Sequence, residues 1–454
     1  MTSMRDVRTG PKRPVRTFSI FAGAVAVFAF AATGPASPAF AAPGAAVSLA
    51  VGGAKSVSDF YKSRGKRPLW LSQQGRQAAL LIDLLESAQL DGLRPDKYRP
   101  DALRNAVSAA QSGNSKAVRR ADMMLSEAFV DYVRDLRQPA DVGTIYVDRE
   151  LRPSAPSDGS ILQAAARAPS LERHVAEMRW MHPVYGALRN ALAAGVMSAE
   201  QRRQVRINLE RARELPAGNG RHIVVNSAAQ RLFMYEDGEV VDSMRVVVGK
   251  PVYPTPMMAA NVRFASLNPY WYVPPDLAAE RIAPNVLKQG VSYLDRLGYQ
   301  VVSDFVDDPK IFDPSVIDWQ AVADGRQKVL IRQQPGAHNS MGRIKFMFPN
   351  EQGVYLHDNP DRQLFEEASR LYSGGCVRLE SAWRLSRWLF GRDLTWKGAG
   401  AEEKVPLDKP VPVYLTYMTA VPNGSDITFL DDVYGRDAAR IAKAEDAEAL
   451  AAAR

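Results

Sequence analysis

The stretch 221–250, RHIVVNSAAQRLFMYEDGEVVDSMRVVVGK, decides the fold class of this chain. It contains three strand-like runs, at 221–226, 230–235 and 239–248, which are separated by short turns. Polar and apolar residues alternate within the runs, as in Arg231/Leu232, and this alternation is typical of half-buried antiparallel strands. Further strands are expected at 262–267, 329–333, 343–348, 353–357 and 411–417. The sequence therefore predicts a mostly antiparallel β domain in this half of the chain.

The sequence before this stretch has a helical pattern. In RQAALLIDLLESAQLDGL, Ala78, Leu81, Ile82 and Leu85 recur at the spacing of one helix face. The segment 198–215 predicts a charged helix with Ser198 as its N-cap. We therefore expect an α+β fold, with a helical domain over 57–216 followed by a β domain over 217–420.

Two segments of the second half depart from the strand pattern. Residues 276–325 are expected to form an insert with helical pieces such as AAERIAPNVLK. Residues 421–454 are expected to form a C-terminal tail. Its final part, GRDAARIAKAEDAEALAAAR, has high helix propensity but few large apolar residues, which predicts a solvated or frayed helix.

The N-terminus indicates export. A basic leader is followed by an apolar run from Phe18 to Ala32 and by the A-x-A pattern Ala39-Phe40-Ala41. This layout is typical of a secretory signal peptide, here 1–41, followed by a linker over 42–56, and the run is short for a membrane span. An uncleaved N-terminal anchor is the alternative.

The charge of the chain argues against a nucleic-acid partner. The formal net charge is +8, and the five basic residues and the single Asp6 of the leader supply +4 of it. The exported part is then only mildly basic, and an exported protein has little access to nucleic acid.

The segment 373–378, SGGCVR, holds the only cysteine of the chain. One cysteine cannot form an internal disulfide, and a free thiol is a liability in an oxidising compartment. Cys376 can therefore be a buried small hydrophobe or a nucleophile, and composition leaves both open.

The surroundings of Cys376 favour catalysis without deciding it. His357 ends an expected strand nineteen residues upstream, where it can serve as the general base for the thiol. We expect Cys376 in a tight loop just before a helix, where the helix N-terminus and Arg378 favour the thiolate. A glycine turn beside a buried cysteine is the alternative.

The two glycines have a physical interpretation as well. Gly374 and Gly375 lack a Cβ and permit φ above zero and close approach of a substrate. The amides of Gly375 and Cys376 are then candidates for stabilising an oxyanion.

Metal binding and cofactors are not predicted. The five histidines and one cysteine show no pair at the spacing of metal ligands. His174, His182 and His222 are expected to be structural, and His338 is expected at the surface.

YLHDNP followed by SGGCVRLE resembles the catalytic signature of the YkuD-type L,D-transpeptidases, in which a histidine precedes a Ser/Thr-His-Gly-Cys-x-Arg motif. Further segments follow in the order of the large periplasmic YcbB-like subfamily, among them INLERAR, VVVGKPVYPTP, NPYWYVPPDLA and GAHNSMGRIKFMFPN. The resemblance covers most of 57–420, and its N-terminal part is similar to the helical scaffold of that subfamily.

The resemblance implies roles for individual residues. Cys376 matches the nucleophile and His357 the general base. Arg378 matches the motif arginine, which binds a carboxylate or braces the loop. Tyr355, two residues before His357, matches a tyrosine that lines the site, and Trp271 resembles an aromatic residue near the acceptor side or a core tryptophan.

Three further residues complete the candidate set. Asn339 lies in a turn that feeds a strand, where a structural role competes with substrate binding. Ser373 either orients His357 or caps the turn. Gly374 stands where the family has a histidine, which leaves the contribution of that position to protonation open.

The resemblance implies an exported, periplasmic peptidoglycan L,D-transpeptidase that needs no cofactor. In that family a cysteine thioester forms on a donor tetrapeptide stem with release of D-alanine, and an acceptor amine then gives a 3→3 cross-link. Hydrolysis or D-amino-acid exchange through the same thioester, and a catalytically silent wall-binding scaffold, are the alternatives. The insert 276–325 is expected to act as a lid that keeps water from the thioester. The small peptidoglycan-binding module of many relatives has no room between the two domains.

Overall fold

The computed structural model describes residues 56–72, 75–218, 220–306, 308–396, 402–424 and 426–452. They belong to one compact unit, Gly52–Arg454. The predicted signal peptide and all of the predicted linker except Ser56 lie outside the described residues. None of the helices that the described residues form combines the length and apolar composition that a membrane crossing requires.

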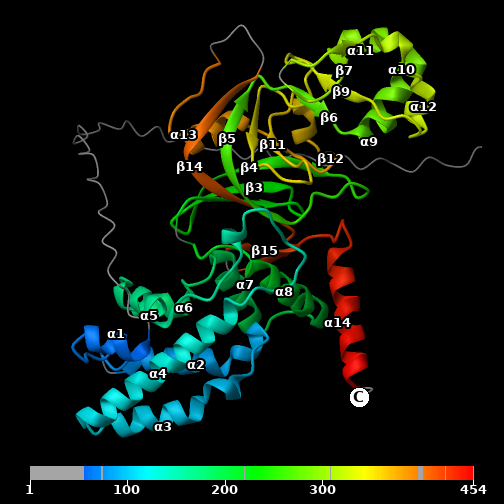
Figure 1. Cartoon of the computed structure of the whole chain (residues 1–454). Helices are drawn as coiled ribbons and strands as arrows, with labels where there is room; N and C mark the ends of the chain where they lie inside the picture. The colour runs from blue at the N-terminus through cyan, green and yellow to red at the C-terminus, as the bar shows by residue number, and fades with distance from the viewer. Residues whose placement is uncertain are drawn as a thin grey trace, which may run out of the picture. The chain divides into compact units, whose positions relative to one another are not determined.

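The first half of the described chain is helical, as predicted (Figure 1). Its α-helices are α1 (Val57–Ser63), α2 (Arg76–Glu86), α3 (Pro100–Ala110), α4 (Ser115–Leu136), α5 (Asp158–Arg167), α6 (Leu171–Ala176), α7 (Pro183–Ala193) and α8 (Ala199–Ala212).

The apolar periodicity of the sequence accounts for this helical core. Ala78, Leu81, Ile82 and Leu85 of α2 are all buried. The predicted cap of α8 is present, because the Ser198 side chain accepts from the Gln201 amide and the Gln201 side chain accepts from the Ser198 amide.

A buried carboxylate fixes the start of the helical part. Asp122 of α4 accepts hydrogen bonds from the amides of Leu69, Trp70 and Leu71 at 2.7, 2.8 and 2.9 Å. Trp70 then packs edge-on against Phe129, with ring centroids 5.1 Å apart. Since Asp122 accepts from three consecutive amides at once, the segment before α2 is held to α4.

The second half forms the predicted β-rich domain. Its main sheet contains β1 (Ile145–Tyr146), β2 (His222–Asn226), β3 (Arg231–Glu236), β4 (Glu239–Gly249), β5 (Met258–Leu267), β10 (Ile344–Met347), β11 (Leu356–His357), β12 (Leu371–Ser373), β13 (Val377–Leu379) and β14 (Glu403–Thr416).

The main sheet closes on itself. Its strand order is β1-β5-β10-β11-β13-β4-β3-β2-β14, and β14 also pairs with β5. Most pairings are antiparallel, whereas β11–β13, β2–β14, β4–β12 and β1–β5 are parallel. The interior is filled by apolar side chains such as Ile223, Leu232 and Phe346, and α13 (Ala382–Phe390) adds Leu385 to this core.

The predicted insert has a core of its own. It contains α9 (Pro275–Leu277), a π-helical turn (Ala278–Ile282), α10 (Ala283–Gln289), α11 (Ser292–Leu297) and α12 (Trp319–Ala323). A second sheet of order β6-β9-β7-β8 joins β7 (Tyr299–Val302) and β8 (Ile311–Phe312) to the flanking strands β6 (Trp271–Val273) and β9 (Leu330–Gln333). The insert is therefore both helical and β, and Figure 1 shows these elements grouped together.

The C-terminal tail is more ordered than its composition predicted. A hairpin of β15 (Ala420–Asn423) and β16 (Asp426–Phe429) precedes α14 (Arg436–Ala452). Asp437 in the first turn of α14 is buried and pairs with Arg211 of α8 at 2.5 Å. The expectation of a solvated tail is wrong for this end of α14, because a buried ion pair anchors it.

Candidate active site

Two paired strands bring four of the predicted residues to one face of the sheet. In the parallel pairing of β11 with β13, Leu356 lies opposite Val377 and His357 lies opposite Arg378. Leu356 and Val377 point into the apolar interior. Because side chains alternate along a strand, Tyr355, His357, Cys376 and Arg378 share the other face.

The imidazole of His357 is buried and oriented. Its Nδ1 lies 2.6 Å from the carbonyl oxygen of Asp358, and since a carbonyl can only accept, Nδ1 carries the proton. Nε2 is then the basic nitrogen. Burial lowers the pKa of His357 to about 3, and the positive charge of Arg378 acts in the same direction. The resting imidazole is therefore neutral at pH 7.

The Asp358 side chain fixes this stretch of backbone. Its Oδ2 accepts from the amide of Arg343 at 3.0 Å, and its Oδ1 accepts from Arg362 at 2.7 Å. Gly342 is required here, because a Cβ at this position would lie 2.5 Å from Asp358 Oδ2. The carbonyl that orients His357 thus belongs to a residue that is itself held on two sides.

Cys376 is a partly buried thiol whose Sγ lies 3.5 Å from the carbonyl oxygen of Gly353. Burial raises its pKa above the ordinary value, and a backbone hydrogen bond from Tyr355 and the charge of Arg378 only partly offset this. Cys376 also does not precede a helix directly, since β13 separates it from α13. The expectation of a helix N-terminus at Cys376 is therefore wrong, whereas Arg378 does favour the thiolate as expected, although burial outweighs its charge.

Ser373 shapes the turn that carries Cys376. Its Oγ donates to the carbonyl of Cys376 at 2.6 Å and accepts from the amide of Gly375 at 3.1 Å. Ser373 thus caps the turn, which is one of the two roles expected from the sequence. The Gly375 amide already has an acceptor, which argues against the predicted oxyanion role for this amide in the resting structure.

The two glycines of the turn differ. Gly375 has φ of 113°, a conformation that favours glycine, and its carbonyl accepts from Thr255 Oγ1 at 2.9 Å. Gly374 is exposed and its φ is not positive. A Cβ at Gly374 would lie 3.4 and 3.7 Å from the two methyl carbons of Leu277, so the insert packs directly over this position.

The guanidinium of Arg378 lies at the edge of the site. Its Nε is buried and has no hydrogen-bond partner among the described residues. Burial lowers the pKa of Arg378, and the neighbouring charge of Arg281 in the π-helical turn of the insert adds to this.

Trp271 and Asn339 lie in different surroundings. Trp271 packs against the core of the insert, with its ring 6.2 Å from that of Tyr299. The Asn339 amide donates to the carbonyls of Pro269 and Gln334 at 2.9 Å each and accepts from the amide of Met341 at 2.7 Å. The contacts of Asn339 therefore hold the turn rather than address a substrate.

Sequence reasoning missed several residues that surround the site. Thr255, Leu277 and Arg281 contact or approach the cysteine turn from distant parts of the chain. Lys345 lies opposite His357 in the pairing of β10 with β11 and forms a buried ion pair with Glu402 at 2.9 Å. The alternation IKFM at 344–347 could have indicated Lys345, because it places a lysine among apolar residues of an expected strand.

The remaining histidines have structural surroundings. His182 and His222 are buried, with their Nε2 atoms 3.3 Å apart, and His222 stacks on Tyr235. His338 is exposed. In the described part of the chain, no cluster of three or more histidine, cysteine or acidic side chains is suited to hold a metal ion.

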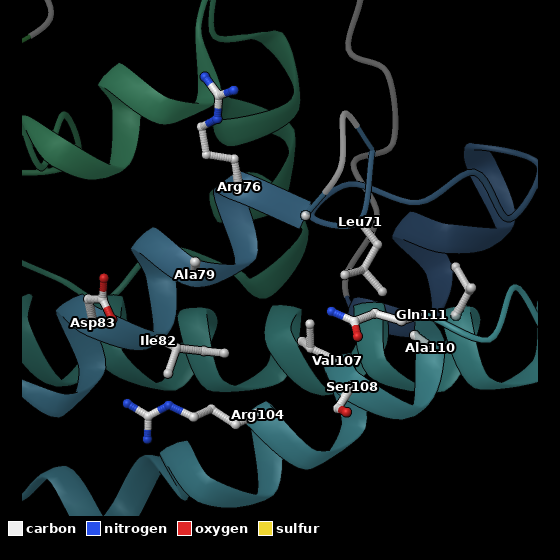
Figure 2. Close-up of a pocket in the computed structure, with 12 residues that line it drawn as sticks. Leu71, Arg76, Ala79, Ile82, Asp83, Arg104, Val107, Ser108, Ala110 and Gln111 are labelled. Carbon is white, nitrogen blue, oxygen red and sulfur yellow. The ribbon is translucent and has the colours of Figure 1, made fainter.

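A separate hollow of about 690 Å³ lies in the helical part, between α2 and α3 (Figure 2). Its charged side chains include Asp83 and Arg104, and Arg104 pairs with Asp101 at 3.3 Å and also with Glu86. The residues that line it include Ser108 but neither a cysteine nor a histidine. The candidate catalytic residues predicted from the sequence lie elsewhere, at the β11–β13 face.

Comparison with known families concerns the two domains as wholes. Residues 220–412 match the model of the L,D-transpeptidase catalytic domain, YkuD, and residues 55–192 match the model of a scaffold domain. The chain carries an L,D-transpeptidase catalytic domain of the YkuD family. The additional scaffold domain is consistent with the predicted YcbB-like subfamily.

Individual relatives are distant. A Haemophilus influenzae protein named "Putative L,D-transpeptidase" is 26% identical over 397 residues, which cover 84% of this chain and 78% of that protein. Solved structures of an L,D-transpeptidase from Mycobacterium smegmatis and of a mutant enzyme from Enterococcus faecium are 16% and 15% identical. Each has a TM-score of 0.21 and covers 44% of this chain. The chain spans 60% and 52% of the lengths of these two structures.

Proposed function

We propose that this chain is an exported peptidoglycan L,D-transpeptidase that forms 3→3 cross-links through a thioester on Cys376. The observation that carries the proposal is the shared face of β11 and β13. There, the partly buried Cys376 directly precedes β13, which pairs with the strand of His357, and the Nδ1 proton of that imidazole is bonded to the Asp358 carbonyl. That hydrogen bond leaves Nε2 to take the thiol proton.

The first half-reaction starts from a neutral pair. Because the pKa of Cys376 is raised and that of His357 is lowered to about 3, the thiol proton moves to Nε2 only as sulfur attacks the donor. The bond from sulfur to the carbonyl carbon of the third stem residue forms, and the amide of Cys376 stabilises the oxyanion. The bond to the terminal D-alanine then breaks, its nitrogen takes the proton from His357, and a thioester remains.

The second half-reaction uses the same groups in reverse. The side-chain amine of an acceptor stem attacks the thioester, His357 accepts a proton from that amine, and the thiol of Cys376 leaves with a proton. The product is an amide that links two stems. No cofactor or metal takes part in these steps.

The insert is proposed to act as the lid of this site. Leu277 packs over Gly374, and the Tyr253 hydroxyl donates to Glu280 in the next turn of the insert. These two contacts place the insert next to the cysteine turn, which remains partly open to solvent. A covered thioester is protected from water, so that an amine competes better with hydrolysis.

The lid is also proposed to recognise the charge of the stem peptide. The charge of Arg281 of the lid lowers the pKa of Arg378 of β13, and the Arg378 Nε has no hydrogen-bond partner among the described residues. A carboxylate of the stem that lies between them relieves this repulsion and accepts two charge-assisted hydrogen bonds. Substrate charge thereby favours the closed lid.

The products of the purified protein with tetrapeptide stems test the proposal. Mass spectrometry should detect a cross-linked dimer and free D-alanine with the wild type, and neither with Cys376→Ala. Tripeptide alone would indicate a carboxypeptidase, and incorporation of an added D-amino acid an exchange enzyme. If none of these products forms, the alternative of a catalytically silent wall-binding scaffold protein would be favoured.

The lid is tested by the ratio of the two products. Leu277→Ala and Tyr253→Phe each remove one contact between the lid and the catalytic turn, and we expect a severalfold higher proportion of hydrolysed tripeptide. Val316→Ala is the matched control, because Val316 is a highly exposed side chain of the same insert. An unchanged ratio in both lid variants would refute the lid.

A further inference from the structure

The segment Leu430–Asp437 lies beyond the part of the chain that matches the catalytic family, yet it contacts the catalytic turn through one intermediate loop. The intermediate is 249–256, GKPVYPTP, between β4 and β5. The contacts are side-chain hydrogen bonds to backbone carbonyls, so they fix where the loop lies.

Thr255 joins the loop to the cysteine turn. It is fully buried, and its Oγ1 donates to the carbonyl of Gly375 at 2.9 Å and accepts from the amide of Gly249 at 2.9 Å. The Lys250 amide adds a bond to the carbonyl of Ser373 at 3.1 Å. The position of the residue before Cys376 therefore depends on where Thr255 lies.

Tyr434 and Arg436 hold the loop from its other side. The Tyr434 hydroxyl donates to the carbonyl of Gly249 at 2.5 Å, and Arg436 Nη2 donates to the carbonyl of Thr255 at 2.9 Å. The Arg436 guanidinium lies 5.0 Å from the centre of the Tyr434 ring and 5.1 Å from that of Tyr417. These stacked groups form one rigid unit against the loop.

The unit is itself anchored. Asp432 accepts from the Tyr417 hydroxyl at 2.8 Å and from the amides of Arg436 and Asp437 at 2.9 Å each, so it caps α14. Asp437 forms the buried ion pair with Arg211 of α8. Figure 1 shows the start of α14 beside α8.

We infer that Tyr434 and Arg436 are positioning residues for the nucleophile: they hold the loop 249–256, and through Thr255 they hold the turn of Cys376. The chain of contacts runs from helix α8 through Asp437 and Arg436 to Thr255 and Gly375. A displacement of α8 is thereby transmitted to the turn of Cys376. We call Tyr434, Arg436 and the loop 249–256 that they hold the brace. A displacement of about 1 Å at a reacting group can lower the rate about 100-fold, so a change in the brace should slow catalysis.

Two readouts test the brace. The rate of alkylation of Cys376 by iodoacetamide, followed by intact mass, reports on the thiol alone, because the chain has one cysteine. The kcat and KM for tetrapeptide stems report on turnover and rest on the proposed function. Tyr434→Phe keeps the ring stack and removes only the donor to Gly249. We expect kcat to fall about tenfold with KM within about twofold, and the alkylation rate to change severalfold.

Two further variants separate positioning from stability. Arg436→Met removes the donor to Thr255, and Arg436→Lys should recover part of the loss. Arg440→Ala is the matched control, because Arg440 lies one turn further along α14 and pairs with Glu210, away from the loop. It should leave kcat and alkylation unchanged even if it lowers the melting temperature.

The path through Thr255 is tested by combination. In a Thr255→Val background the additional effect of Arg436→Met should disappear, because both changes break the same connection. Wild-type kcat and alkylation in Tyr434→Phe and Arg436→Met, or full additivity with Thr255→Val, would overturn the inference. If the wild type does not turn over tetrapeptide stems, the proposed function fails. The alkylation rates of the variants then decide by themselves whether Tyr434 and Arg436 position Cys376.

Discussion

A single methyl group at Gly249 should disable the site from a distance. A Cβ on Gly249 would lie 2.0 Å from the carbonyl oxygen of Tyr253 and 2.6 Å from the amide nitrogen of Thr255. Ordinary contact begins at 3.4 Å, so the loop 249–256 must retreat by about 1.4 Å from the Tyr253 carbonyl alone. Gly249 does not have positive φ, so alanine adds a collision without backbone strain.

The size of the effect follows from the contacts of Thr255. A retreat of about 1.4 Å breaks its 2.9 Å bond to the Gly375 carbonyl, because a hydrogen bond does not tolerate that displacement. We therefore expect Gly249→Ala to cost about 1–3 kcal/mol of stability from overpacking. Thioester formation should slow by about 100-fold, in line with a misplaced reacting group.

The assay is single-turnover acylation of Cys376 by a tetrapeptide, with thermal unfolding alongside. Gly424→Ala serves as control, since Gly424 has φ of 63° and a Cβ there meets no atom within 4 Å. The control should lose about 1 kcal/mol of stability from the left-handed conformation and keep its acylation rate. Wild-type acylation in Gly249→Ala would refute the argument that the loop positions the nucleophile.

Three further predictions concern charge and the lid. The rate of alkylation of Cys376 should reach half its maximum at a pH above the ordinary thiol pKa, because burial raises the pKa of this thiol. Arg378→Met should raise this midpoint further, since the positive charge that partly offsets burial is lost. A midpoint below pH 7 would contradict this prediction. Burial lowers the pKa of His222 to about 4, whereas the ordinary pKa of histidine is 6.5. Between these two values the unfolded state binds more protons than the folded state. The free energy of unfolding should therefore fall as the pH drops through this window, by up to about 1.4 kcal/mol per pH unit. Urea titrations at several pH values should show a shallower dependence for His222→Asn, and an identical slope would contradict it. Gly374→His should fold normally but crowd Leu277, and Leu277→Ala should rescue any loss of acylation; failure of that rescue would show that the insert is not the cause.

One half of the candidate face could be predicted from local pattern. Tyr355 and His357 are two residues apart on an expected strand, so strand periodicity places both side chains on one side, whereas Cys376 and Arg378 were expected in a loop. The parallel pairing that joins the two strands is set by long-range register and was not visible in the sequence. The strand β13 is only three residues long, too short to show a period, which is why the following helix was placed next to Cys376.

Contacts between distant segments and the effect of burial on pKa could not be predicted from the sequence. Thr255 meets Gly375 across 120 residues, and Arg436 meets Thr255 across 181, so neither contact has a local signal. The protonation state of Cys376 was misjudged because charges can be counted in a sequence whereas desolvation cannot. The tail was judged by its few large apolar residues, although buried polar groups such as Asp437 anchor its start.

The most direct test of the account is the intact mass of the protein after brief mixing with a tetrapeptide stem. The account predicts an adduct on Cys376 that equals the tetrapeptide less its terminal D-alanine. His357→Gln should slow its formation by about 100-fold or more, since it removes the general base. The adduct should be absent in Cys376→Ala. Wild-type acylation in His357→Gln, or an adduct that persists in Cys376→Ala, would contradict the central claim that this thiol and this imidazole form the catalytic pair.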